Sequence, residues 1–341
     1  MPAIPASGAI SLTDFATEFG GTAPHSMSEY YRNGANVPSN NSNVPTTGAF
    51  RFGHMRGAIN EIIIAATSGA NVDISGLFGA NWTSTVPKRL TVSAGVTIGG
   101  TGSSAALIIP ANMAGTLEID NAGDIIGFGG ASAGAAGGHA INCAVSGVTI
   151  NNTGLLAGGG GAGNVGGTGG NGSFTTSSYT QWYGNGSYMW YGSSAKYIKW
   201  GGSLVSGNVG NNTTSYGIYR RGSQWRSDYP SEGQDAYQVR RLESSTSSSS
   251  GGAGGSFGVG AGYNQSATNG QSGSSGGTNA GNGGAGSNGA ALGTAASNGA
   301  TGANGNASNG SAGASGGAAG AAVTGTSVTM NNSGTLHGAV A

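Results

Sequence analysis

The stretch Val148–Gly158, VTINNTGLLAG, recurs as LEIDNAGDIIG at Leu117–Gly127 and as VTMNNSGTLHG at Val328–Gly338. In each copy apolar and polar residues alternate, which is the pattern of a half-buried β-strand. An Asn-x-Gly step follows and predicts a tight turn, because Asn tolerates and Gly prefers positive φ. We therefore expect a β-body that the chain leaves after the second copy and rejoins at the third.

Further strands are expected before the first copy. Short β-branched runs broken by Gly, Asn and Ser favour a sandwich or a solenoid-like body. The predicted fold class is mostly β and irregular, with very little α-helix. The β-body should span 61–158 and be completed by 322–341. The runs that predict strands are 61–65, 71–74, 89–92, 95–98, 106–109 and 116–119.

Composition limits the functions that the chain can have. Of 341 residues 72 are Gly, charged residues make up 7%, and the formal net charge is zero. One large aliphatic core is not expected for such a chain. From Ser244 to Ala341 there is no Lys, Arg, Asp or Glu, so this segment offers no electrostatic surface to nucleic acid or an acidic membrane. We expect no nucleic-acid partner, no membrane insertion and no classical secretion signal.

Several runs within 159–321 have glycine at every third residue, and this period matches the three residues per turn of polyproline II. Collagen is disfavoured because the runs are short, broken and free of Pro. Short polyglycine-II-type segments packed side by side would satisfy the backbone hydrogen bonds through their Gly faces. The alternative is a flexible Gly/Ser linker. The runs comprise Gly160, Gly163, Gly166, Gly169 and Gly172; Gly283, Gly286 and Gly289; Gly299, Gly302 and Gly305; and Gly310, Gly313 and Gly316.

Residues 1–60 contain a repeat of their own. The segment Ile4–Phe15 recurs forty residues later as Val44–Met55, and between them Ser26 and Glu29 predict a capped short helix. So small a module buries little by itself. It is either a subdomain packed on the rest of the chain or a docking module that a partner completes. We predict it as the attachment module, anchored by Phe15, Phe19, Tyr30, Tyr31, Phe50, Phe52 and Met55.

Residues 174–243 interrupt the low-complexity pattern with aromatic and basic residues. Tyr, Trp and Arg are enriched at recognition hot spots, and Gly, Ser and Asn fill the spaces between them as in antibody loops. Alternatively, the rings form a local mini-core, and the two roles can coexist. The predicted receptor-binding residues are Tyr179, Trp182, Tyr183, Tyr188, Trp190, Tyr191, Tyr197, Trp200, Tyr216, Tyr219, Arg220, Arg221, Trp225, Arg226 and Tyr229.

Catalysis has little support in the sequence. The four histidines are scattered and no clustered His/Asp/Glu set or CxxC occurs, so a metal site or a catalytic triad lacks its residues. The Gly runs lack the Lys-Ser/Thr of a phosphate loop. We expect no enzyme activity, no cofactor and no metal. Cys143, the single cysteine, is expected to be a small buried residue.

From about Met55 onwards the chain resembles the glycine-rich adhesins at the tips of T-even-type phage long tail fibres. The residues that carry the resemblance are 121–130, 152–161 and above all 323–339. In that family an N-terminal part attaches to the fibre tip, polyglycine II helices follow, and distal loops touch the host's outer-membrane receptor. The N-terminal repeat departs from that family and looks like modules of other phage tail proteins. The aromatic segment is larger than the family's loops.

These observations predict a virion-borne adhesin, synthesised in the host cytoplasm and mounted on a tail fibre or on the central tail tip. Its target would be a bacterial outer-membrane protein or a surface glycan. A rival is a structural or assembly protein of the tail fibre that makes no receptor contact. Another is an ice-binding protein, since some of these stack polyproline II helices, but the Trp-rich segment does not fit its flat, regular face.

Overall fold

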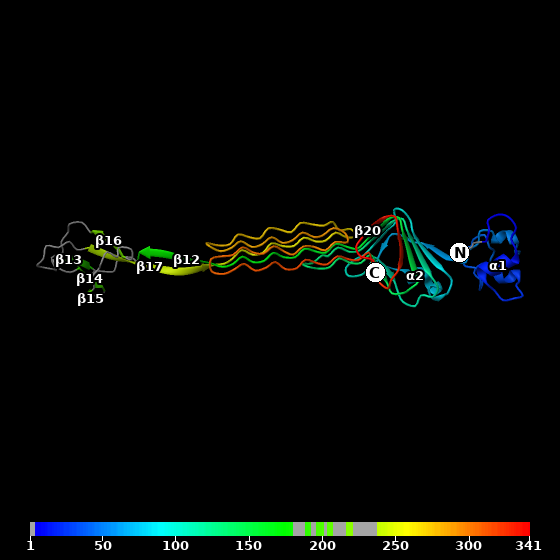
Figure 1. Ribbon diagram of the computed structural model, residues 1–341, viewed down its shortest axis with the longest axis horizontal. Coiled ribbons are helices and arrows are strands. Elements are labelled where there is room, and N and C mark those ends of the chain that lie inside the picture. Colours follow the sequence, from blue (N-terminus) through cyan, green and yellow to red (C-terminus); the bar gives the residue numbers. More distant parts are fainter. Residues whose placement is uncertain (1–3, 180–187, 192–195, 201–202, 207–215, 221–236) are drawn as a thin grey trace.

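The computed structural model describes residues 4–179, 188–191, 196–200, 203–206, 216–220 and 237–341, and between 177 and 244 it describes only backbone and strand pairing. The molecule is elongated (Figure 1). A small helical module forms one end, a body of parallel strands follows, and a rod of extended segments leads to strands β12–β17 at the other end. The fold is mostly strand and irregular structure, as the sequence predicts.

The N-terminal module is built around α1 (Leu12–Phe19) and two 3-10 turns, η1 (Met27–Tyr30) and η2 (Phe52–Met55). Ser11 begins α1, because its hydroxyl accepts from the Asp14 N–H at 3.3 Å and its own N–H donates to the Asp14 carboxylate at 2.6 Å. This reciprocal pair is a capping box. Helix α1 was not predicted from the sequence.

The other predicted features of the module are present. The short helix expected after Ser26 is η1, with the Ser26 N–H donated to Glu29 at 3.0 Å. The forty-residue repeat is also structural: Gly8 and Gly48 occupy equivalent turns with φ of 88° and 84°. The buried residues of the module form a cluster of their own, made of Ile4, Phe15, Phe19, Tyr30, Val37, Val44, Met55 and Ala58.

The β-body is a solenoid of three parallel sheets rather than a sandwich, because each successive turn of chain adds one strand to each sheet. Val340 completes the last turn by pairing with Val323. The first sheet contains β1 (Ile62–Ala65), β4 (Lys88–Val92), β7 (Leu117–Asn121), β10 (Val148–Asn152) and β19 (Thr329–Asn332). The second contains β2 (Gly69–Ala70), β5 (Thr97–Gly99), β8 (Asp124–Ile126), β11 (Leu155–Ala157) and β20 (Thr335–His337). The third contains β3 (Val72–Asp73), β6 (Leu107–Ile109), β9 (Ile141–Cys143) and β18 (Val323–Gly325).

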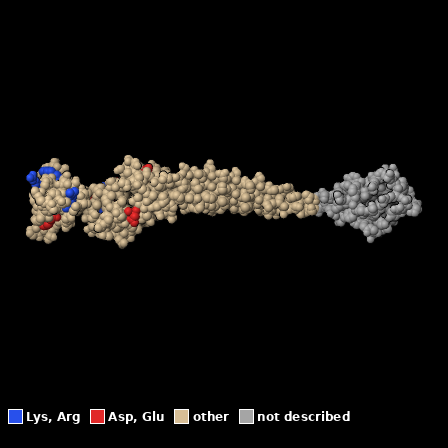
Figure 2. Space-filling view, turned by 180° about the vertical axis from the view of Figure 1, so that it is seen from behind, with Lys and Arg blue, Asp and Glu red and all other residues tan. Residues whose placement is uncertain are grey.

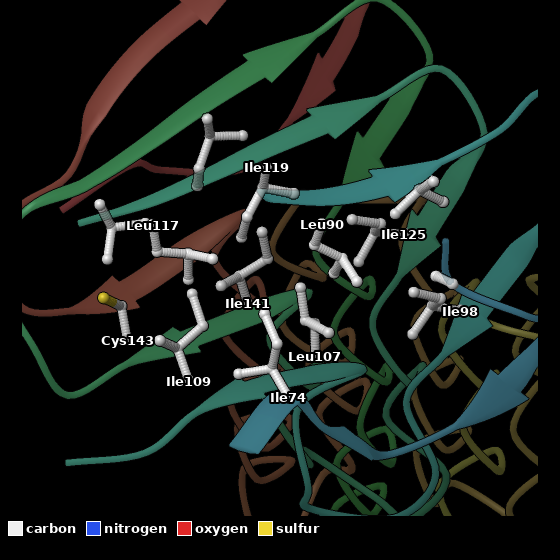
Figure 3. Packing of buried hydrophobic residues seen from close by; sticks show 14 of the residues in the cluster. Ile74, Leu90, Ile98, Leu107, Ile109, Leu117, Ile119, Ile125, Ile141 and Cys143 are labelled. Atoms are coloured by element: carbon white, nitrogen blue, oxygen red, sulfur yellow. The ribbon is translucent and has the colours of Figure 1, made fainter. Parts of the chain in front are cut away.

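The solenoid core is a stack of equivalent apolar residues (Figure 3). Leu90, Ile119 and Ile150 are register partners in the first sheet, and Ile98 and Ile125 are partners in the second. All five are buried. Each turn packs its apolar residues against those of the neighbouring turns, as in other repeat proteins. The motif therefore recurs because each turn needs the same inward-facing residues.

One end of this core is covered by α2 (Ile74–Phe78) and the 3-10 turn η3 (Gly79–Thr83). The buried side chains of this cover are Ile74 and Phe78 of α2 and Trp82 of η3. The sequence predicts a strand as far as Ile74, but helix begins there. The reason is that the Asp73 side chain accepts from the Ser75 N–H at 2.9 Å and caps the first turn.

The Asn-x-Gly steps lie where turns were predicted, but their glycines serve another purpose. None of Gly123, Gly154 and Gly334 has a positive φ. A Cβ on Gly154 would lie 2.1 Å from the Gly123 carbonyl oxygen, and one on Gly334 would lie 2.3 Å from the Gly154 carbonyl oxygen. Glycine is needed here because consecutive turns of the solenoid stack backbone against backbone.

The rod occupies the interval between β11 and β18, so it interrupts one turn of the solenoid. In its first segment, 158–171, every third N–H donates to a carbonyl of the segment 251–262. Gly163 donates to Gly258 at 2.8 Å and Gly166 donates to Gly255 at 3.0 Å. This is the packing that the glycine period predicts. Residues 127–140 join it at the base, where Gly130 donates to Gly160. The six segments are 158–171, 251–262, 265–277, 280–291, 294–306 and 308–321.

Antiparallel strands lie at the far end of the rod. β12 and β17 form a ribbon, and β17 continues into a sheet of order β12-β17-β13-β14-β15, with β16 also paired to β17. The strands are β12 (Gly172–Tyr179), β13 (Tyr188–Tyr191), β14 (Lys196–Trp200), β15 (Ser203–Ser206), β16 (Tyr216–Arg220) and β17 (Tyr237–Ser249).

Candidate functional site

The chain leaves the rod and returns to it at the distal end, opposite the N-terminal module (Figure 1). β12 begins at Gly172, and its register partner Ser249 ends β17. Residues 172–249, here called the distal insert, thus start and finish at one point. Two turns of the rod, 277–280 and 305–308, contact this point.

Asparagines from these two turns hold the base of the ribbon. The Ser173 N–H donates to Asn306 Oδ1 at 2.6 Å, and the Ser173 carbonyl accepts from Asn306 Nδ2 at 2.9 Å and Asn279 Nδ2 at 3.0 Å. On the other strand the Ser249 hydroxyl donates to the Thr278 carbonyl. Asn279 has φ 57°, which Asn tolerates better than most residues. These bonds fix the direction in which the insert leaves the rod.

The distal sheet brings together many of the predicted receptor-binding residues. Trp190 and Tyr197 are direct register partners, and Tyr188 and Tyr219 both pair with Gln238 from opposite sides of β17. Those within described strands are Tyr179, Tyr188, Trp190, Tyr191, Tyr197, Trp200, Tyr216, Tyr219 and Arg220. Those outside the described residues are Trp182, Tyr183, Arg221, Trp225, Arg226 and Tyr229.

The predicted attachment residues separate into two groups. Phe15, Phe19, Tyr30 and Met55 are buried in the module's own core. A partner can therefore touch only the remaining three, Tyr31, Phe50 and Phe52. Phe52 is 38% exposed and lies 5.1 Å, centroid to centroid, from Phe15. Phe50 lies 5.5 Å from Tyr31 with the rings edge to face.

Among the residues whose side chains the structure describes, Lys, Arg, Asp and Glu lie in the N-terminal module and the solenoid, and the rod carries none (Figure 2). On the solenoid, Arg89 lies among three carboxylates, at 3.1 Å from Glu61, 2.7 Å from Glu118 and 2.7 Å from Asp120. Burial acts to lower the pKa of Arg89, but hydrogen bonds to Asp120 and Glu61 raise it overall above its ordinary value. This cluster ties three turns together and leaves its cation fully paired, so it is structural.

Chemistry-bearing residues are few in the part of the chain that the structure describes. No group of three His, Cys, Asp or Glu that could hold a metal occurs among the described residues. Likewise, no described helix is long and apolar enough to cross a membrane. Cys143 is buried, as predicted, and burial raises the pKa of its thiol. His139 accepts the Ala321 N–H at 3.0 Å and so serves the backbone.

Three comparisons place these features among known proteins. The model of the family described as phage tail fibre adhesin Gp38 matches residues 59–245, which is more than half of the chain. The N-terminal module lies outside this match. No curated protein matches the chain. Among solved structures, the gp37-gp38 adhesin tip complex of the bacteriophage S16 long tail fibre aligns with 98% of this chain and 100% of that chain, at 17% identity and a TM-score of 0.36.

Proposed function

The chain belongs to the phage tail fibre adhesin Gp38 family, and on this premise we propose that it binds a receptor on the bacterial host surface through the distal insert. The receptor is an outer-membrane protein or a surface glycan. Binding requires no catalysis, because the interaction is one of attachment by aromatic and basic residues on a stiff support.

The placement of the insert carries this proposal. Its two ends meet at Gly172 and Ser249, at the end of the molecule farthest from the N-terminal module. The rod that separates the insert from the solenoid is cross-linked between its segments by backbone hydrogen bonds at every third residue. A rigid spacer with its most aromatic segment at the tip suits a protein that presents a binding surface away from its mounting point.

We propose that the N-terminal module provides that mounting point, on a tail fibre protein or on a central tail-tip protein. Its core shares no residue with the solenoid core, so the module is an independent unit. Phe52, Phe50 and Tyr31 leave aromatic surface on it that a partner can cover. The similar solved structure is itself a complex of two tail fibre proteins, gp37 and gp38.

The strand register offers a direct test of the insert's role. Thr176 and Ser245 are opposite each other in the ribbon, so joining them through Asn-Gly removes 177–244 and leaves a short hairpin. We expect the insert-free protein to keep the melting behaviour of its solenoid and rod but to lose binding to host cells. Retained binding would move the receptor site elsewhere. The chain should also be present in purified particles, whereas an assembly factor would be absent.

A further inference from the structure

Asparagine is followed by glycine at six places in the part of the rod that comes after the distal insert. An Asn-Gly step is prone to spontaneous deamidation, because Gly has no Cβ to hinder the approach of its nitrogen to the Asn side chain. All six asparagines are exposed, so neither local sequence nor exposure distinguishes them. The steps begin at Asn269, Asn282, Asn288, Asn298, Asn304 and Asn309.

Deamidation needs the backbone nitrogen of the Gly and the Cγ of the Asn to meet. The Gly nitrogen bonds to Cγ, its proton passes to the departing Nδ2, and ammonia leaves. Water then opens the resulting succinimide ring, giving Asp by cleavage at Cγ or isoaspartate by cleavage at the backbone carbonyl. The reaction therefore requires the Gly N–H to leave its hydrogen bond and the extended backbone to open locally.

Four of the six steps are held by two hydrogen bonds each. At the step beginning at Asn288, the Gly289 N–H donates to the Thr268 carbonyl at 3.0 Å, and Asn288 Oδ1 accepts from the Gly270 N–H at 2.9 Å. At the other three steps the Gly N–H groups donate from Gly283 to Ser274, from Gly299 to Ala314 and from Gly305 to Ser308, each at 2.9 Å. Their Asn Oδ1 atoms accept from Gly276 to Asn282 at 3.0 Å, from Gly316 to Asn298 at 3.2 Å and from Gly310 to Asn304 at 3.0 Å.

The steps at Asn269 and Asn309 have neither of these bonds. In the part of the chain that the structure describes, neither side chain hydrogen-bonds to another residue, and the following Gly N–H has only a side chain as its acceptor. An exposed side chain rotates away more readily than a backbone carbonyl within the packed rod. The two acceptors are Asn288 Oδ1 for Gly270, at 2.9 Å, and Asn304 Oδ1 for Gly310, at 3.0 Å.

We propose that Asn269 and Asn309 are the sites at which the native protein deamidates, and that the rod protects the other four steps. The reaction does not depend on the receptor. It adds carboxylates to a rod that contains no Lys, Arg, Asp or Glu. Isoaspartate at 309 also lengthens the backbone directly after the turn 305–308, whose Asn306 holds Ser173 at the base of the distal insert. Ageing at this position therefore loosens the insert.

The proposal is tested on full-length protein kept in mildly alkaline buffer below its melting temperature, beside the denatured chain in the same buffer. Digestion with an acid protease and electron-transfer fragmentation locate each converted residue and separate Asp from isoaspartate. We expect similar rates at all six steps in the denatured chain. In the native protein Asn269 and Asn309 should convert about tenfold or more faster than the other four. Uniform native rates, fastest conversion at another step, or no conversion at these two would overturn the proposal.

Two variants test the hydrogen bonds that restrain the reactive steps. Asn288→Ala removes the acceptor of the Gly270 N–H, so it should speed conversion of Asn269 about tenfold and leave Asn309 unchanged. Asn304→Ala removes the acceptor of the Gly310 N–H and should have the converse effect.

The rod supplies matched controls for these variants. Asn282→Ala and Asn298→Ala remove acceptors of the same kind, from Gly276 and Gly316, but each of these glycines follows Ser. Neither control should change the rates at the two reactive steps, and melting temperatures of all four variants are compared. Equal acceleration in the controls would show that general loosening sets the rates and would overturn the assignment.

Amide exchange over 172–179 tests the consequence for the distal insert. Aged wild-type protein should exchange faster there than fresh protein. Asn309→Ala cannot deamidate at this position, so its exchange should not change on ageing. An equal change in the two proteins would overturn the link between Asn309 and the insert.

Discussion

Within the solenoid, asparagines at equivalent positions form a ladder through successive turns. Asn121 Nδ2 donates to Asn152 Oδ1 at 2.7 Å, and Asn152 Nδ2 donates to Asn332 Oδ1 at 2.7 Å. Asn121 and Asn152 are buried, and buried amides need such partners. Each motif copy therefore has Asn at this position because its side chain hydrogen-bonds to the equivalent Asn of the adjacent turn.

Asn152→Leu should destabilise the solenoid by about 1–3 kcal/mol, because it leaves the buried Asn121 amide without its acceptor, whereas the exposed Asn332 can bond to water instead. Asn331→Leu is the matched control, since Asn331 is the exposed neighbour of the ladder. That substitution should change stability by less than about 0.5 kcal/mol. Denaturant unfolding of both variants provides the measurement, and equal losses would refute a special role for the buried ladder.

The rod glycines are required for close approach between segments. A Cβ on Gly302 would lie 2.1 Å from the Thr168 carbonyl oxygen. Gly302→Val should therefore cost about 1–3 kcal/mol or more through overpacking. Ala303→Val, on the exposed side of the same segment, should cost far less. Amide exchange over 276–320 checks both, and a similar response in the two variants would contradict the packed arrangement.

Cys143 makes stability depend on pH in a predictable direction. Burial raises the pKa of its thiol above the ordinary value of 9.0, so the folded state keeps the proton to higher pH than the unfolded state. The stabilisation is complete below pH 9.0 and is lost as pH rises through the folded pKa, by up to about 1.4 kcal/mol per pH unit. Cys143→Ala should lack this slope between pH 8 and 11, and identical profiles would contradict the prediction.

At the scale of elements, the ribbon depends on the turns beneath it. Asn306 bonds both the N–H and the carbonyl of Ser173, and Asn279 adds a third bond. A two-stranded ribbon is marginally stable without such support. Nothing in the sequence distinguishes these asparagines from the many others in Gly-rich turns, because only the folded rod brings 279 and 306 to residue 173.

Asn306→Ala should loosen the ribbon without unfolding the rod. Loss of two hydrogen bonds, at roughly 1 kcal/mol each, should speed amide exchange in 172–179 by tenfold or more. Asn309→Ala, at an exposed position just past the same turn, is the control. Unchanged exchange in Asn306→Ala would show that strand pairing alone holds the ribbon.

At the scale of the whole molecule, mounting and binding are separated along the long axis (Figure 1). Removing residues 1–56 should leave the solenoid and rod folded, because the two cores share no residue, while particles should lack the truncated chain. Phe52→Ser is the milder variant, since it changes an exposed ring and leaves the buried core of the module intact. Particle composition after purification is the measurement, and full incorporation of the truncated chain would exclude the module as the mount.

The sequence by itself determined the elements whose patterns are local. Alternation in the three motif copies predicts the strands, the period of three in Gly160–Gly172 predicts the packed extended segments, and Ser26 with Glu29 predicts η1. Each follows from the geometry of a few consecutive residues. The choice between a sandwich and a solenoid remained open, because a strand's own residues do not state which strand it pairs with.

Only the tertiary structure decided the features that depend on distant neighbours. Gly154 has the composition of a turn residue, yet its lack of a side chain matters because another turn of the solenoid passes within contact distance. Tyr30 and Phe52 look alike as aromatic anchors, yet one is buried and the other exposed. Trp190 and Tyr197 are direct partners only because β13 pairs with β14. Main-chain hydrogen bonds are alike at every residue, so the pairing of distant segments had to come from the fold.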